Sequence, residues 1–235
     1  MANTIKYAIA WADYDKYTGG KAEINIWNPR VQAGGDFSVS QIWLMSKNIQ
    51  TSIEVGWIAD GYVNTGCYNL KCPGFVQVNH AIALGGTVTP ISVFDGPQYK
   101  MTVSIFKDAN TGNWWLQVED DAIGYWPSSL VPGIADGAEM VQYGGEIFDV
   151  ATEVGTAVAH TTTEMGSGHF PSEGERKASV FTNVQVLERT QTYKSPAMLK
   201  TSVGNPNCYD LQVKRSDNWG MYFFYGGPGR NPNCN

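Results

Sequence analysis

Short segments that alternate between polar and apolar residues, separated by turns rich in glycine and proline, constrain the fold of this chain most. The clearest of them covers residues 37–45. Strand alternation places five of its side chains on one face: Phe37, Val39, Gln41, Trp43 and Met45. No segment keeps a helical period over ten or more residues. The sequence therefore predicts an all-β protein.

Other segments have the same strand character, at a spacing of roughly 8–12 residues. They cover residues 7–11, 22–27, 52–57, 99–106, 114–118, 123–126, 140–148, 178–187 and 221–225. We expect turns at 19–20 and 110–113, and one short helical turn within 128–136. There is no linker-like change in composition and no internal repeat. This pattern is typical of one antiparallel β-sandwich or barrel, and we expect a single domain over residues 1–235.

Composition excludes two classes of partner. Charged residues make up 16% of the chain, against roughly 25% in ordinary soluble proteins. The net charge is −6, the pI is about 5.0, and the few basic residues do not cluster. Nucleic acid is therefore not an expected partner. No apolar run reaches about 18 residues, so we expect no membrane span. A chain with few bases also gains little positive charge in acid, which favours acid tolerance.

Four cysteines, at positions 67, 72, 208 and 234, permit three disulfide connectivities. Local pairing, Cys67 with Cys72 and Cys208 with Cys234, is the simplest. Zinc is the competing interpretation, but no CxxC spacing exists. Disulfides would indicate an oxidising compartment. No signal peptide is visible, so we expect a mature, secreted domain without its leader.

Two glutamates lie in strand-like apolar segments, where a carboxylate must be exposed, paired or functional. Glu54 shares a strand face with Ser52 and Gly56, and Glu146 shares one with Gly144. These small neighbours leave room for a ligand. If both faces line one curved sheet, the carboxylates converge, and one pKa rises because both cannot ionise easily. The alternative is two separate exposed glutamates.

The histidines give weaker signals. His160 and His169 bound the densest polar stretch of the chain, and His80 stands alone. A metal site or a Ser–His pair would fit the residue types, but the stretch lacks a metal-ligand spacing and the G-x-S-x-G elbow. We favour a loop folded over the sheet, in which hydroxyls and imidazoles satisfy backbone groups.

Aromatic pairs at 114–115 and 125–126 fit the core, with one member of each pair free to line a groove. Sugar and proline rings both stack on such surfaces. The glycine-rich segment 226–230 precedes no helix, which argues against a phosphate site.

The ordered motifs resemble the catalytic domain of the neprosin family of glutamic prolyl endopeptidases. They run from about residue 37 to the end of the chain. The matching strings are Gln41-Ile42-Trp43, Glu54-Val55-Gly56-Trp57, Thr65-Gly66-Cys67-Tyr68-Asn69-Leu70, Gly74-Phe75-Val76-Gln77, Gly112-Asn113-Trp114-Trp115-Leu116, Gly124-Tyr125-Trp126-Pro127, Gly144-Gly145-Glu146, Met165-Gly166-Ser167-Gly168-His169-Phe170, Cys208-Tyr209-Asp210 and Phe224-Tyr225-Gly226-Gly227-Pro228-Gly229.

This resemblance implies an antiparallel two-sheet β-sandwich, concanavalin- or jelly-roll-like, with the active site in a concave groove. It implies catalytic roles for Glu54 and Glu146, no metal and no cofactor. It implies the disulfides Cys67–Cys72 and Cys208–Cys234. The expected activity is hydrolysis of peptides after proline, highest in acid. We expect five residues to contribute to substrate binding: Gln41, Trp57, Trp114, Tyr125 and Trp126.

The chain departs from the family pattern in two ways. Only residues 58–64 separate Trp57 from Thr65, where the family has a longer stretch, and the family's N-terminal activation domain is absent from this chain. We expect a monomeric, secreted glutamic peptidase whose partners are proline-containing peptides. A glycoside hydrolase and a non-catalytic carbohydrate-binding sandwich are the rival interpretations.

Overall fold

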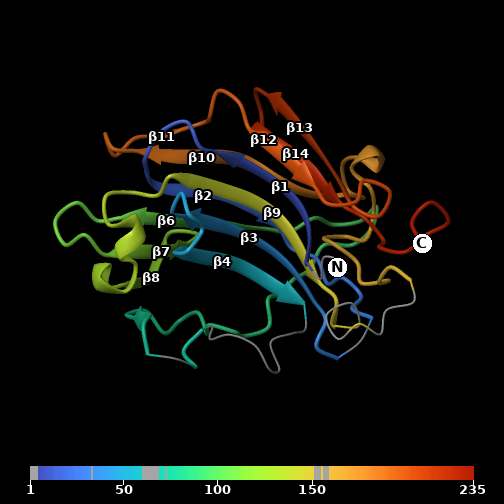
Figure 1. The fold of residues 1–235 in the computed structure, drawn as a ribbon, viewed down its shortest axis with the longest axis horizontal. Coiled ribbons are helices and arrows are strands. Elements are labelled where there is room, and N and C mark those ends of the chain that lie inside the picture. The colour runs from blue at the N-terminus through green and yellow to red at the C-terminus, as the bar shows by residue number, and fades with distance from the viewer. Residues whose placement is uncertain (1–4, 33, 60–68, 72, 151–154, 156–158) are drawn as a thin grey trace.

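Two antiparallel β-sheets, packed one on the other, build the protein (Figure 1). The structure is a computed structural model that describes residues 5–32, 34–59, 69–71, 73–150, 155 and 159–235. Within these ranges the only helical segments are short 3₁₀ turns. The all-β sandwich expected from the alternating segments is confirmed.

The first sheet has five strands. Their order is β12 (Lys200–Val203), β1 (Ile5–Ala12), β9 (Met140–Phe148), β3 (Phe37–Met45) and β4 (Ser52–Ala59). All neighbours are antiparallel. The two strands that carry the candidate glutamates, β4 and β9, are therefore separated only by β3.

The second sheet has nine strands. Their order is β13 (Asp210–Ser216), β14 (Gly220–Gly226), β10 (Ser179–Glu188), β2 (Tyr17–Asn25), β6 (Lys100–Lys107), β7 (Trp114–Val118), β8 (Asp121–Trp126) and β5 (Val76–Gln77), while β11 (Tyr193–Lys194) pairs with β10. In Figure 1 the five-stranded sheet lies across this larger sheet.

The main core fills the space between the sheets with apolar side chains from both. Three hydrogen bonds also join the layers. The Tyr143 hydroxyl donates to the Gln185 carbonyl at 2.7 Å, and the Trp57 indole donates to the Asn25 carbonyl at 3.0 Å. Ser40 and Tyr225 share a short hydroxyl–hydroxyl bond. These contacts satisfy buried polar groups and fix one sheet against the other.

The turn expected at Gly19–Gly20 is wrong, because both glycines lie inside β2. The two sheets approach each other closely at Gly20. A Cβ atom there would come within 2.6 Å of the Val141 side chain and 3.0 Å of the Tyr143 hydroxyl. Gly20 thus marks a tight contact between sheets, one of the roles that glycine has inside a strand.

The turn expected at 110–113 is confirmed, whereas the segment 128–136 has two helical turns where one was expected. Residues 110–113 connect β6 to β7, and the Asp108 carboxylate accepts hydrogen bonds from the backbone and hydroxyl of Thr111. The segment 128–136 holds two 3₁₀ turns, η1 (Ser128–Leu130) and η2 (Pro132–Ile134). A third, η3 (Pro171–Glu173), lies in the long connection before β10. Among the described residues, none of the helices is long and apolar enough to cross a membrane.

Candidate active site

Glu54 and Glu146 lie on the same face of the five-stranded sheet, the face turned away from the main core. Glu54 is opposite Trp43 of β3, and Glu146 is opposite Val39 of the same strand. Residues directly opposite in an antiparallel pair project to the same side, and residues two apart in a strand also do. Both carboxylates are therefore neighbours of Gln41, which lies between Val39 and Trp43.

The middle of this face forms a depression, because two residues of its central row are glycines without side chains. Gln41 is directly opposite Gly56 on one side and Gly144 on the other. A Cβ atom at Gly144 would approach the Ala8 carbonyl to 2.3 Å, and one at Gly56 would approach the Ser40 carbonyl to 1.9 Å. The close backbones exclude larger residues at both positions. The Gln41 side chain is thus flanked by strands without side chains.

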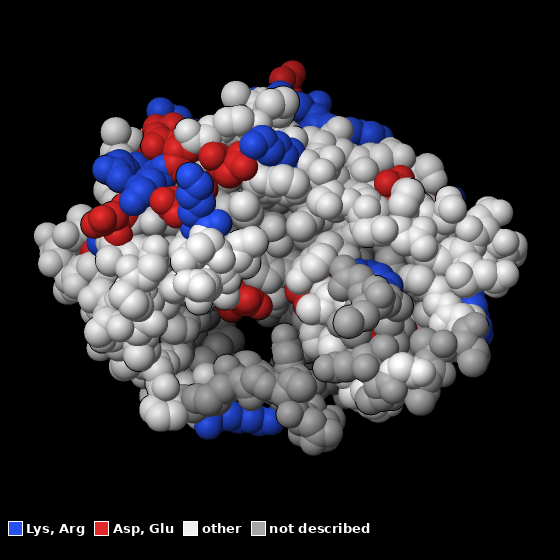
Figure 2. Space-filling model, in the orientation of Figure 1, with Lys and Arg blue, Asp and Glu red and all other residues white. Residues whose placement is uncertain are grey.

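Apolar side chains surround this row. They form a second hydrophobic cluster, separate from the main core, whose members are Tyr7, Ile9, Trp11, Phe37, Val39, Trp43, Met45 and Phe148. Phe37 and Phe148 stack with ring centroids 5.3 Å apart. Figure 2 shows a hollow near β3 and β4 with acidic atoms at its margin. The face therefore combines carboxylates with an apolar surround, as a peptide-binding site requires.

Glu54 is the exposed member of the pair, and two donors hold its carboxylate. The Gln41 amide donates to Oε2 at 3.0 Å, and the Ser52 hydroxyl donates to Oε1 at 2.8 Å. Hydrogen bonds of this kind stabilise an ionised carboxylate. Solvent also reaches this group, which suits a base that takes a proton from water.

Glu146 is the buried member, with a 9% exposed fraction. Its register neighbours are Val39 on β3 and Tyr7 on β1. The pKa of Glu146 is raised from 4.5 to about 8. The main cause is burial, and the second is the negative charge of Glu54. Glu146 therefore carries a proton across the acid and neutral range, while its neighbour is free to be an anion. One face thus presents a proton donor and a proton acceptor together.

Of the five residues expected to bind substrate, only Gln41 lies on the face that carries the two glutamates. Gln41 lies between the two glutamates, as described above. Trp57 and Trp114 instead belong to the main core, with exposed fractions of 6% and 0%. Trp57 is three residues after Glu54, so it projects to the opposite face of β4. The expectation that these two tryptophans line the groove is corrected on these grounds.

Tyr125 and Trp126 lie on β8, in the other sheet. Trp126 packs against the main core and meets Phe75 edge-on, with centroids 4.7 Å apart. Tyr125 is opposite Trp115, and their rings are 5.0 Å apart. Since β8 alternates, Tyr125 projects away from the core side that Trp126 faces. Neither ring shares the face that carries the two glutamates.

Sequence reasoning did not select as binding residues the aromatic residues that share this face: Tyr7, Trp11, Phe37, Trp43 and Phe148. One signal was present, because the alternation in 37–45 places Trp43 on the same side as Gln41. Tyr7 and Trp11 reach the face only through the pairing of β1 with β9. That pairing joins segments more than a hundred residues apart, which no local pattern reveals.

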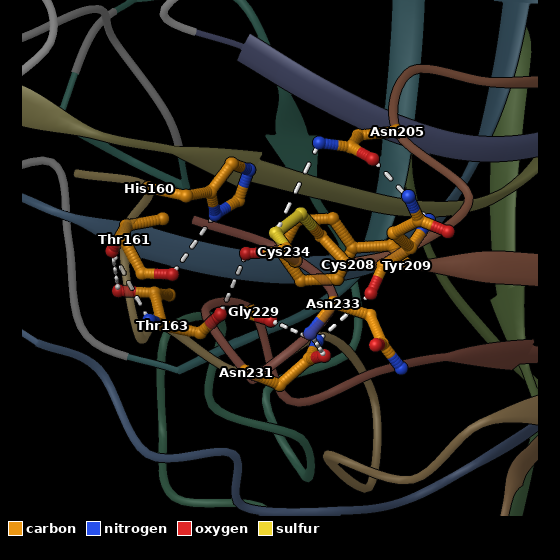
Figure 3. Close-up of a disulfide and its surroundings, with 11 residues drawn as sticks. His160, Thr161, Thr163, Asn205, Cys208, Tyr209, Gly229, Asn231, Asn233 and Cys234 are labelled. Carbon is orange, nitrogen blue, oxygen red and sulfur yellow. Dashed lines mark hydrogen bonds between the residues drawn. A yellow bond between two sulfur atoms is a disulfide. The ribbon is translucent and has the colours of Figure 1, made fainter.

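The disulfide Cys208–Cys234 is present, as expected, and closes a loop with a sequence separation of 26. Cys67 and Cys72 lie outside the described residues. His160 lies beside the disulfide, and the Asn205 amide points at the Cys234 sulfur from 3.9 Å (Figure 3). The ligand atoms of His160 and the two cysteines are within 4.8 Å of one another. The sulfurs are bonded to each other, so they are not thiolate ligands.

The polar stretch from His160 is a loop whose side chains satisfy neighbouring groups, as favoured from the sequence. His160 Nδ1 donates to the Thr161 carbonyl at 3.0 Å. The Thr163 hydroxyl donates to the buried carboxylate of Asp36 at 2.9 Å and accepts from the backbone of Gln32 at 2.9 Å. Farther along, His169 pairs with Glu173 at 2.9 Å.

Comparison with known protein families gives one match. The family model described as Neprosin matches residues 47–228, which is more than half of the chain and includes both candidate glutamates. The match begins after β3, so Gln41 and the strands β1, β2 and β3 lie before it.

Proposed function

The chain belongs to the Neprosin family, which supports a peptidase-type function, and from that premise we propose that it is a glutamic endopeptidase that cuts after proline. One observation carries the proposal beyond the family. A buried, protonated Glu146 and an exposed, hydrogen-bonded Glu54 flank Gln41 on one sheet face. Such a pair can supply both an acid and a base without any other group.

In the proposed reaction, ionised Glu54 removes a proton from a water molecule, and the oxygen of that water attacks the scissile carbonyl carbon. Glu146 then donates its proton to the leaving nitrogen as the carbon–nitrogen bond breaks. The proton held by Glu54 returns to Glu146 through solvent. The products are a carboxylic acid and an amine, and both glutamates regain their starting states. Burial of Glu146 supports its role as the acid, because burial disfavours the charged form.

Specificity for proline rests on the resemblance and on the character of the face. Proline has no backbone N–H, so a site recognises it by shape and apolar contact. The partly exposed rings of Tyr7 and Trp11 offer such contact near the glutamates. We propose that a proline-containing segment lies against these rings. The disulfide Cys208–Cys234 supports an oxidising, extracellular location, and we propose that the chain acts there as a monomer.

Cleavage of matched peptides tests the proposal. A quenched fluorescent peptide with one proline and its Pro→Ala counterpart are compared at pH 4 and pH 7, with a β-glucan as the test of glycosidase activity. We expect cleavage after proline and no release of sugar. Glu54→Gln and Glu146→Gln should each lower kcat/KM at least about 100-fold, because the amide cannot exchange the proton. The control is Glu175→Gln, which changes an exposed glutamate outside this face. Near-parental turnover in either site variant contradicts the proposal.

Inhibitors provide a second test of the chemistry. The proposed steps use only carboxyl groups and water, so we expect EDTA, fluorophosphonates and thiol reagents to leave the rate unchanged. Loss of activity with EDTA, restored by a divalent metal, would assign the reaction to a metal centre instead.

A further inference from the structure

Gln41 lies between the two glutamates, but the roles proposed for Glu54 and Glu146 assign no function to it. We propose that Gln41 uses one amide hydrogen to hold Glu54 and presents the other to the oxygen of the scissile carbonyl. This inference rests on the proposed function and deepens it. It makes Gln41 a positioning residue toward Glu54 and an oxyanion-binding residue toward the substrate.

The position of Gln41 in the sheet places it beside both carboxylates. Gln41 lies on β3, between the strands of Glu54 and Glu146. Glu54 is diagonal to it on β4 and Glu146 is diagonal to it on β9, in opposite directions along β3. Diagonal neighbours in a sheet are within reach of long side chains. A peptide carbonyl held between the acid and the base therefore lies over Gln41.

The Gln41 amide has more hydrogen-bonding capacity than Glu54 uses. Gln41 Nε2 carries two hydrogens, and one is donated to Glu54 Oε2 at 3.0 Å. Within the described part of the chain, no second acceptor is recorded for this nitrogen. The opposite orientation of the amide would place its oxygen against the Glu54 carboxylate, which is repulsive. The bond to Glu54 thus fixes the amide with one donor to spare.

The site around Gln41 is formed without substrate. Its side chain has an exposed fraction of 8%, and Gly56 and Gly144 flank it. Donors that are fixed before the reaction stabilise developing negative charge without reorganisation. Removing one such donor costs about 100- to 1,000-fold in kcat in other hydrolases.

A second glutamine on this face provides a matched comparison. Gln142 is opposite Trp43 and Trp11, and its exposed fraction is also 8%. No hydrogen bond joins it to Glu54 or Glu146 among the described contacts. Residue type, burial and face are the same for Gln41 and Gln142, but Gln142 is flanked by Trp43 and Trp11 instead of glycines and is not bonded to either carboxylate.

Few other charged side chains from the strands of the sheet face Gln41 and the two glutamates. Besides Glu54 of β4, the titratable residues on the same face of these strands are Glu146 of β9, Tyr7 of β1, and Lys200 of β12 at the far edge. Lys200 is paired with Asp13 at 2.9 Å. A change in the pH profile caused by Gln41 therefore reports on Glu54 and Glu146.

The test compares Gln41→Met with Gln142→Met on the proline peptide, with kcat, KM and the full pH profile measured for each. Methionine keeps the length and removes the donor. For Gln41→Met we expect kcat to fall about 100-fold, KM to change less than about threefold, and the acid limb to move to higher pH. The limb moves in this direction because a carboxylate that loses a donor keeps its proton longer. For Gln142→Met we expect the acid limb to stay in place. An unmoved acid limb with a kcat loss below about fivefold in Gln41→Met overturns the inference.

A spectroscopic measurement tests the inference without turnover. The side-chain amide resonances of Gln41 are followed by ¹⁵N NMR over pH 2–9 in the unsubstituted protein and in Glu54→Gln. We expect these resonances to respond to pH in the unsubstituted protein and to lose this response in Glu54→Gln. A Gln41 amide that does not respond to Glu54 overturns the inference even if the peptidase proposal holds. Retained cleavage in Glu54→Gln or Glu146→Gln instead contradicts the peptidase proposal itself.

Discussion

Glu146 is unusual at the scale of a single residue because it is a carboxyl group with a 9% exposed fraction. Among its described contacts no cation is paired with the Glu146 carboxyl group. The charge that acts on it is that of Glu54, which has the same sign. Burying an unpaired charge is expensive, so the group holds a proton instead. Its high pKa then links its proposed role as the acid to the stability of the fold.

We predict that Glu146→Gln stabilises the protein at neutral pH. In the unfolded chain Glu146 ionises near 4.5, and in the folded protein near 8. The folded state thus binds more protons between these values, and stability falls as pH rises through them. Glutamine stays neutral and avoids this loss. One pKa unit corresponds to about 1.4 kcal/mol, so the gain should reach the order of 2–4 kcal/mol at pH 8.

Urea denaturation of Glu146→Gln at pH 4, 6 and 8 measures this gain. It should be near zero at pH 4, because both forms are then neutral, and should grow at pH 6 and pH 8. Glu175→Gln, at an exposed position, should show no such trend. An equal gain at all three pH values would mean that packing, not ionisation, causes it.

The sequence identified both glutamates, since each is a charge in an apolar strand, but it did not distinguish them. The difference arises from neighbours on other strands, Val39 and Tyr7 beside Glu146 and solvent beside Glu54. The expectation for Trp57 failed for a related reason. Its motif adjoins Glu54 in the sequence, but the alternation of β4 sends the ring to the core.

At the scale of elements, the long strands of the sandwich were predictable because they alternate or are apolar throughout. The strands that were missed are β5, β11, β12 and β13. They are short, or rich in exposed polar residues, as in Lys200–Val203 and Asp210–Ser216. Three of them, β5, β12 and β13, end a sheet. Edge strands bury little apolar surface, so their sequences carry a weak signal.

We predict that Gly20→Ala destabilises the protein by about 1–3 kcal/mol, because a Cβ atom would force Val141 of the facing sheet to move. Gly34→Ala is the control, since nothing lies within 4 Å of a Cβ atom at Gly34. The free energy of unfolding in urea gives both values. Equal stability of the two variants would show that the sheets separate at Gly20 without strain.

The disulfide that fastens the C-terminal segment gives another prediction at this scale. Replacing Cys208 and Cys234 by alanine should lower the free energy of unfolding by about 3 kcal/mol, because it frees a loop with a separation of 26. The expected bridge between Cys67 and Cys72 closes a much shorter loop, and its loss should cost about 1.5 kcal/mol less in the same treatment. Peptide mapping without reduction checks both pairings, and a crossed pairing would contradict this ranking.

At the scale of the whole molecule, low charge density determines the range of pH in which the fold persists. The chain has 16 Lys and Arg residues and 22 Asp and Glu residues in 235. Full protonation of the carboxyl groups therefore leaves a modest positive charge for this length, and self-repulsion in acid stays small. Glu146 also favours the folded state in acid, because the folded protein binds its proton more tightly than the unfolded chain does. The protonated state of Glu146 thus favours both the stability of the fold and the proposed reaction.

The expected pH profile of peptidase activity follows from the protonation states of Glu54 and Glu146. The proposed mechanism needs Glu54 ionised and Glu146 protonated. Sequence reasoning alone gives an optimum within about pH 2–5, since isolated glutamates titrate near 4.3. Burial of Glu146 raises the upper limit, because its pKa is about 8. We therefore predict that kcat/KM rises in acid, stays high through about pH 7, and falls with an apparent pKa near 8 as Glu146 loses its proton. Rates on the proline peptide at pH 2–9, with stability checked at each pH, measure this profile. A fall centred at pH 5–6 would show that solvent reaches Glu146 in the working enzyme and that the pair, not the buried residue alone, sets the limit.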